Sequence, residues 1–137
     1  MLVTRKITVI AILILLISLS GCFNSKKHNQ EMQEACGKTA AKYFADNFPS
    51  SAYYGRYDSH YNSKEDKCFI KVYGLAKTSN SIELHLIDVN DNKSWGYCSV
   101  GSIIVCEVAG KKCDSGDKTP FQVQARWNAL AKKYMEQ

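Results

Sequence analysis

The chain of 137 residues lacks several features that mark common functional classes. Its longest apolar run, at residues 7–19, is shorter than the roughly 20 residues that a membrane-spanning helix needs. It has no glycine-rich phosphate loop and no nucleophile elbow. Its cysteines and histidines include no closely spaced pair of the kind that binds zinc. We therefore expect no cofactor and no metal site.

The chain also lacks a strong charge of either sign. It has 18 basic and 13 acidic residues and a formal net charge of +5. Arg5 and Lys6 lie in a leading segment without acids, so the remainder carries +3. Because the two signs are interspersed, the composition does not suggest a nucleic-acid-binding protein.

The N-terminus has the order of a secretory signal. Arg5 and Lys6 supply a positive start, an almost wholly apolar stretch follows at 7–19, and small residues precede Cys22. The last four residues, Leu19-Ser20-Gly21-Cys22, resemble the lipobox of bacterial lipoprotein precursors. This resemblance covers residues 1–22. It implies that residues 1–21 are removed and that Cys22 becomes the first residue, with a diacylglycerol on its thiol.

The same resemblance implies a membrane anchor in the cell envelope. Many lipoproteins also receive a third acyl chain, such as palmitate, on the new amine of the cysteine. Several chains are needed because burial is worth about 0.8 kcal/mol per methylene and one short chain binds only reversibly. Phe23, not Asp, follows Cys22. The absence of Asp at this position resembles lipoproteins of the outer membrane, where the protein would lie on the periplasmic face if the host is Gram-negative.

After the signal, the composition predicts a tether and one domain. Residues 22–30 are mostly polar and would link the lipid to the domain. Residues 31–137 are enough for a single hydrophobic core. Apolar residues at helical spacing predict a helix over 31–47, which ends at Phe48-Pro49. Thr119, Pro120 and Gln122 give a capping box for a second helix.

The region between the two helices alternates as strands do. We expect strands at about 56–61, 67–77 and 81–89, and either one long or two short strands over 94–108, with a bend at Gly101. The short connections suit hairpins. The predicted fold is therefore α+β: an N-terminal helix, an antiparallel meander of three to four strands and a C-terminal helix, with both helices on one sheet face.

Five cysteines remain once Cys22 is lipidated, and an exported chain meets an oxidising compartment. Cys36 on the first helix and Cys68 on a central strand both face inward, which predicts a disulfide between helix and sheet. Cys106 and Cys113 flank a tight turn and would lie opposite each other, within disulfide reach. This leaves Cys98 as a small buried residue; the alternative pairs Cys98 with Cys106 or Cys113.

The richest candidate for a contact surface is a tyrosine cluster. Tyrosine gives a large amphipathic area at low entropic cost, which favours interfaces. An alternative is that some of these rings cover the open end of the core. The candidate surface consists of Tyr53, Tyr54, Tyr57, His60 and Tyr61.

A catalytic reading of the same region is weaker. His60 could act as a base, oriented by Asp58 or Asp66, with Cys98 or Ser59 as the nucleophile. A triad needs its parts brought together, and no motif does so. We therefore expect no catalytic residues and take His60 as a residue that supports the neighbouring turn.

Together these features predict a non-enzymatic envelope lipoprotein that presents a disulfide-braced binding domain to a protein partner. The mature domain resembles the small disulfide-braced lipoproteins of bacteria that have no assigned activity. Exclusion of phage or plasmids and support of envelope assembly fit this prediction. A different possibility is an inhibitor of a secreted hydrolase such as lysozyme, although the two helix patterns count against the β-barrels common among such inhibitors. An enzyme using His60 or Cys98 is a third.

Overall fold

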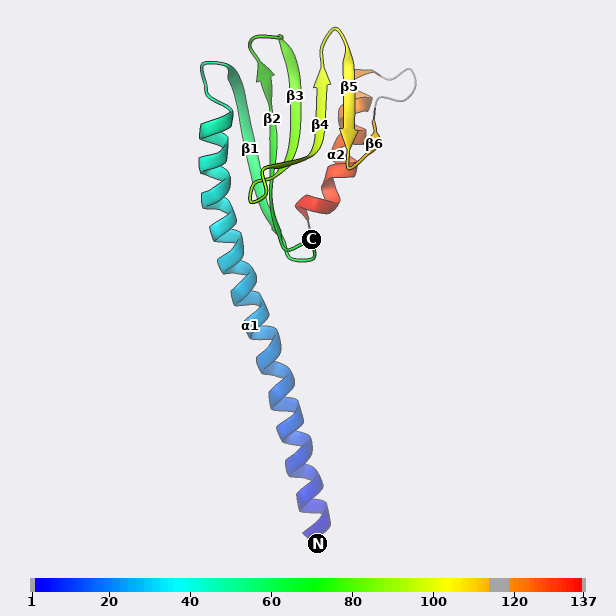
Figure 1. Cartoon of the computed structure of the whole chain (residues 1–137). Coiled ribbons are helices and arrows are strands. Elements are labelled where there is room, and N and C mark those ends of the chain that lie inside the picture. The colour runs from blue at the N-terminus through cyan, green and yellow to red at the C-terminus, as the bar shows by residue number, and fades with distance from the viewer. Residues whose placement is uncertain (1, 114–118, 137) are drawn as a thin grey trace. The chain divides into compact units, whose positions relative to one another are not determined.

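The computed structural model describes residues 2–113 and 119–136, with side chains from residue 25 onward (Figure 1). The chain divides into two units, residues 1–32 and 33–137. Its elements are α1 (Leu2–Asn47), β1 (Tyr53–Asn62), β2 (Lys67–Ala76), β3 (Ser81–Asp88), β4 (Lys93–Val100), β5 (Ile104–Val108), β6 (Lys111–Lys112) and α2 (Pro120–Met135).

Helix α1 begins far upstream of the predicted start at residue 31 but ends at Asn47, as predicted. Residues 22–30 are helical, since they contain no proline or glycine and an ion pair, Lys27–Glu31 at 3.9 Å, supports this turn. In the described part of the chain, no helix is long and apolar enough to cross a bilayer. The signal peptide and the lipidated tether stay predictions.

The predicted fold class is confirmed: a helix, an antiparallel meander and a second helix form an α+β domain. Within residues 2–113 and 119–136, six strands follow each other in sequence order across one sheet. The predicted count of three to four strands is too low, because the 94–108 region breaks near Gly101 and β6 adds a further short strand. Asp66, Asn80 and Asn92 take a positive φ in the turns, where short polar side chains tolerate this conformation.

Residues 33–47 of α1 and helix α2 lie on opposite faces of the sheet, so the prediction that both helices pack on one face is wrong. Neighbouring residues on a strand point to opposite faces. Cys68 of β2 is bonded to Cys36 of α1, whereas the next residue, Phe69, stacks on Tyr134 of α2 with ring centroids 5.2 Å apart. The face of Cys68 is called the α1 face below, and the face of Phe69 the α2 face.

On the α1 face, helix α1 is held by a disulfide and by aromatic rings. The Cys36–Cys68 bond confirms the predicted link between helix and sheet. Phe44 lies 4.8 Å from Tyr57, and Phe48 lies 5.1 Å from His85, measured between ring centroids. These contacts tie the last turns of α1 to β1, β2 and β3.

On the α2 face, helix α2 covers the larger core. Thr119 accepts from the backbone of Gln122, whose side chain accepts from the Thr119 amide, so the predicted capping box is confirmed. Trp127 is fully buried at the centre of this core. The strand residues packed with this helix include Phe69, Leu84, Leu86, Cys98, Cys106 and Val108.

Candidate functional site

The predicted tyrosine surface is not contiguous. Tyr53, Tyr57 and Tyr61 point to the α1 face, where Tyr53 and Tyr61 are buried, while Tyr54 and His60 point to the opposite face. The strand alternation that was visible in the sequence causes this split. Tyr53 donates to the backbone oxygen of Glu83 at 3.2 Å, and burial raises the pKa of its phenol well above the usual value. These buried rings are therefore part of the core.

The residues considered for catalysis are also separated. Ser59 and His60 point to opposite faces of β1. Cys98 is fully buried on β4, and two strands, β2 and β3, lie between it and β1. With neighbouring strands roughly 4.8 Å apart, His60 and Cys98 lie on strands about 14 Å apart. Neither nucleophile is therefore placed next to this imidazole.

The remaining described cysteines form one buried cluster under α2. The structure does not contain the predicted Cys106–Cys113 disulfide, and Cys106 is a thiol. The hairpin geometry behind that prediction is correct, because Val108 pairs with Lys111 and the Cys113 amide donates to the Cys106 carbonyl at 2.8 Å. Burial, together with the neighbouring Cys98 and Cys113 thiols, raises the pKa of the Cys106 thiol.

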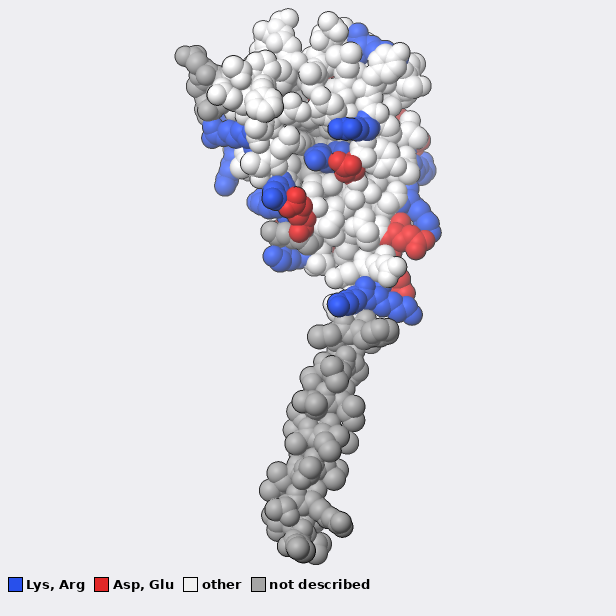
Figure 2. Space-filling view, turned by 180° about the vertical axis from the view of Figure 1, so that it is seen from behind, with Lys and Arg blue, Asp and Glu red and all other residues white. Residues whose placement is uncertain are grey.

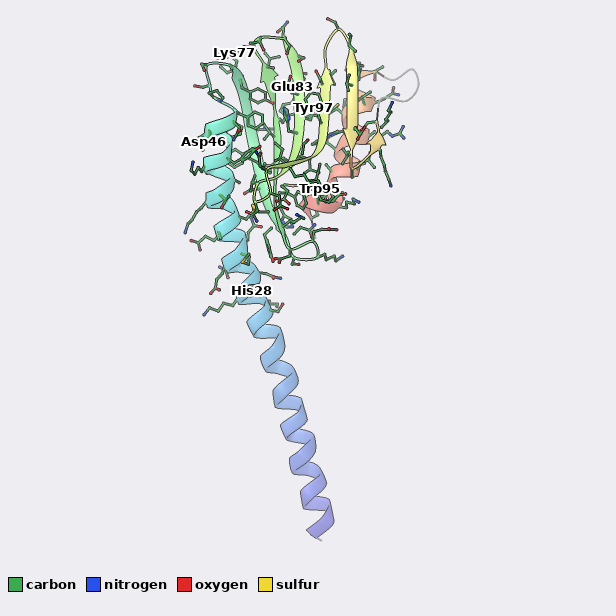
Figure 3. The ribbon with its side chains drawn as sticks, viewed as in Figure 1. His28, Asp46, Lys77, Glu83, Trp95 and Tyr97 are labelled. Carbon is green, nitrogen blue, oxygen red and sulfur yellow. A yellow bond between two sulfur atoms is a disulfide. The ribbon has the colours of Figure 1, made fainter. Side chains whose placement is uncertain are left out.

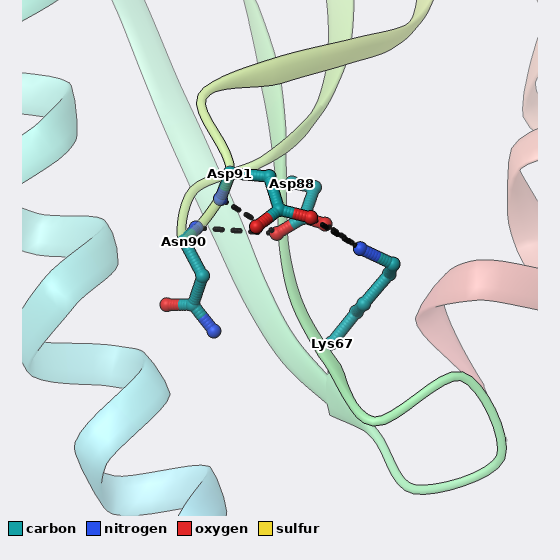
Figure 4. A network of polar contacts seen from close by, with 4 residues as sticks. All are labelled: Lys67, Asp88, Asn90 and Asp91. Carbon is teal, nitrogen blue, oxygen red and sulfur yellow. Dashed lines mark hydrogen bonds and ion pairs between the residues drawn. The ribbon is translucent and has the colours of Figure 1, made fainter.

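The most buried carboxylate belongs to a polar network that holds the β3–β4 turn (Figure 4). Asp88 is fully buried, and its side chain accepts from the backbone amides of Asn90 and Asp91 at 3.1 and 3.4 Å. Lys67 donates to Asp88 and to Asp91, which raises the pKa of the Lys67 ammonium and lowers that of the Asp91 carboxyl. Because both Asp88 oxygens accept hydrogen bonds from within the chain, we interpret this network as one that stabilises the turn.

A pocket lies on β4 and β5, and we call it the β4–β5 pocket. Its volume is about 560 Å³, within the range of roughly 300–1,000 Å³ typical of ligand sites. Aromatic and apolar side chains lie beside one basic and one acidic side chain. It is lined by Lys93, Ser94, Trp95, Gly96, Tyr97, Val105, Glu107, Ala109 and Gly110.

Local strand geometry explains this pocket. The pairing of β3 with β4 shifts between Leu86 and Ile87, which leaves Trp95 as the extra residue of a bulge. The centroid of the Trp95 ring lies 5.3 Å from that of Tyr134, and the Lys93 ammonium lies 5.1 Å from the Trp95 centroid. Tyr97 and Glu107 are direct cross-strand neighbours on the α1 face. Val105, on the same face, is 51% exposed, so no helix covers it.

Tyr97 of the pocket belongs to a carboxylate–imidazole–phenol cluster with Glu83 and His85. Glu83 and Tyr97 are labelled in Figure 3. Glu83 accepts from the Tyr97 hydroxyl at 3.3 Å and lies 3.2 Å from Nε2 of His85. Burial lowers the pKa of His85, although the contact with Glu83 opposes this shift. The hydrogen bond to Glu83 restrains the orientation of the Tyr97 side chain, which lines the pocket.

A second, more polar hollow follows α2 on the other face. It is a series of three depressions that share Arg56 and Tyr73 at one junction and Lys71 and Asn128 at the next. Its charged groups largely compensate each other, as in Lys71–Asp58 at 3.7 Å. Figure 2 shows that basic and acidic side chains are interspersed on the side of the molecule opposite to the view in Figure 1. The β4–β5 pocket is the stronger candidate, because it combines the larger volume with exposed apolar surface.

Sequence reasoning missed the pocket residues Trp95, Tyr97, Val105 and Glu107. The signal that was available is glycine between two aromatic residues in Trp95-Gly96-Tyr97, since glycine inside a strand often marks a bulge. Among the residues described, no three His, Cys, Asp or Glu side chains are arranged to hold a metal ion. Comparison with family models, curated proteins and solved structures found no match to this chain.

Proposed function

We propose that the protein is a bacterial envelope lipoprotein, anchored by lipid on Cys22, whose domain binds a protein partner through the β4–β5 pocket. The observation that carries the anchor is the signal-like segment that ends in Leu19-Ser20-Gly21-Cys22. The anchor would hold the domain in the envelope, and on the periplasmic face of the outer membrane in a Gram-negative host.

The composition of the pocket supports a protein as the partner. Tyrosine and tryptophan are enriched at protein interfaces, where they bury much area at low entropic cost. Val105 lies in the pocket wall and, at 51% exposure, adds apolar surface to it. Lys93 and Glu107 offer one charge of each sign at the same site, which suits a peptide segment better than a ligand of a single charge.

Two experiments test the two parts separately. Labelled palmitate should enter the wild-type product and should not enter the Cys22→Ala variant; equal labelling of both would refute the anchor. For the pocket, a photo-crosslinking residue at Val105 should capture a defined partner in the intact envelope. The matched control is the same residue at Phe121, which is 79% exposed and outside the pocket. Capture of the same partners at both positions would refute the pocket as the binding surface.

A further inference from the structure

The three cysteines beneath α2 are placed in a row by two strand pairings. Cys98 of β4 lies directly opposite Cys106 of β5. The β5–β6 hairpin continues the row, because Glu107 pairs with Lys112 and the next step places Cys106 opposite Cys113. All three side chains are at most 1% exposed and belong to the same core. Cys106 is therefore the common neighbour of two other sulfurs.

The backbone hydrogen bonds distinguish these two pairs. Opposite residues in an antiparallel ladder alternate between hydrogen-bonded pairs, with α-carbons about 5.5 Å apart, and non-hydrogen-bonded pairs, about 4.5 Å apart with closer side chains. The Cys113 amide donates to the Cys106 carbonyl at 2.8 Å, so Cys106 and Cys113 form a hydrogen-bonded pair. Because the amide and carbonyl of one residue point to the same side of a strand, Cys106 is in a non-hydrogen-bonded pair with Cys98.

An independent contact gives the same assignment. The Ala109 amide donates to the Trp95 carbonyl at 2.6 Å, which marks a hydrogen-bonded position between β4 and β5. Two residues along, Tyr97 and Glu107 occupy the next such position. Cys98 and Cys106 fall in the following register position, where the side chains approach most closely.

We propose that Cys98 and Cys106 form a second disulfide, with Cys113 as the alternative partner of Cys106. The α-carbons of a non-hydrogen-bonded pair are about 4.5 Å apart, which is within the roughly 4.4–6.8 Å that disulfides span. Each of the two thiols loses a proton, and the pair gives two electrons to the disulfide of an oxidant, which becomes two thiols. If the thiolate of Cys113 then attacks the Cys106 sulfur, it displaces the Cys98 thiolate, with no net oxidation.

The new bond would brace the candidate binding site from behind. Tyr97 and Glu107 are the chain neighbours of Cys98 and Cys106 and point to the opposite face, into the pocket wall. A covalent link between the two strands fixes the spacing of these two side chains. This role, and an oxidising envelope as the source of the oxidant, rest on the proposed function; the pairing itself does not.

Peptide mapping of the refolded chain tests the pairing. The full-length Cys22→Ala chain is refolded in a buffer of reduced and oxidised glutathione, and the reaction is quenched with acid. The chain is then denatured, its remaining thiols are labelled with N-ethylmaleimide, and it is cut with trypsin. Cleavage after Lys93, Lys111, Lys112 and Lys118 leaves Cys98 and Cys106 together in peptide 94–111 and Cys113 in peptide 113–118. We expect peptide 94–111 to lose both reactive thiols and its mass to fall by two hydrogens, while peptide 113–118 is labelled.

Two variants sharpen the result. Cys113→Ala should leave the bond within peptide 94–111 unchanged, whereas Cys98→Ala should produce a cross-link between peptides 94–111 and 113–118. Labelling of both thiols of peptide 94–111 in a chain with an intact Cys36–Cys68 bond would overturn the proposal. A dominant cross-link to peptide 113–118 in the parent chain would overturn it as well. Since the oxidant is glutathione, a failure of membrane anchoring in cells would not alter either result.

Discussion

Removing the Cys36–Cys68 bond should destabilise the domain more than any of the other substitutions considered below. The bond joins residues separated by 32 positions. In the chain-entropy model, a loop of that length is worth about 3–4 kcal/mol, because the cross-link restricts the unfolded chain. Since a domain of this size is typically stable by about 5–15 kcal/mol, the Cys36→Ala/Cys68→Ala variant should lose a large share of its stability.

The assay is urea unfolding followed by the fluorescence of Trp95 and Trp127, both within the domain. All chains carry Cys22→Ala, so that an unlipidated Cys22 cannot form a disulfide with another cysteine. The double variant should have a much lower midpoint and a larger slope, since its unfolded chain exposes more surface.

The matched control is Cys113→Ala. It removes a buried sulfur outside the Cys36–Cys68 bond and measures the loss of packing alone, about 1 kcal/mol. A double variant that unfolds within about 1 kcal/mol of the parent would refute the loop-closure reasoning.

Three smaller effects follow from individual contacts. Burial lowers the pKa of His85 below its ordinary 6.5, so its contribution to stability is present above pH 6.5 and is lost as the pH falls through the lowered pKa. In the His85→Gln variant, the midpoint of urea unfolding should therefore depend less on pH between about pH 5 and 8. Ala109 has a φ of 48° at the first position of a two-residue hairpin turn, so Ala109→Asn should stabilise by about 1 kcal/mol, whereas unchanged thermal unfolding would contradict the strain argument. Thr119→Ala should cost about 1 kcal/mol, and Thr119→Ser should restore most of it, because the hydroxyl caps α2.

Much of the fold follows from local chemistry in the sequence. The end of α1 and the cap of α2 were predicted because proline and threonine act on the backbone within a few residues. The tight turn between Cys106 and Cys113 was also predicted, and its two central residues, Ala109 and Gly110, have a positive φ. The structure confirms these features without tertiary information being needed for any of them.

The arrangement of the two helices could not be obtained in this way. On β2, Cys68, Ile70 and Val72 form one apolar row, while Phe69 and Tyr73 lie on the other. A sheet that is covered on both faces has apolar residues in both rows. The sequence pattern therefore assigns residues to the two faces but does not indicate which helix covers each face. The disulfide partner of Cys68 and the ring partner of Phe69 supply that information.

The candidate site depends on this two-sided arrangement, which explains why sequence reasoning missed it. The contacts of α1 reach β1, β2 and β3, so the α1 face of β4 and β5 is left without a helix over Val105. On the other face α2 buries Cys98 and Cys106. Because neighbouring residues alternate, the same two strands present an exposed pocket wall on one face and a dry row of thiols on the other. A bond formed among the buried thiols would therefore act on the pocket through the backbone alone.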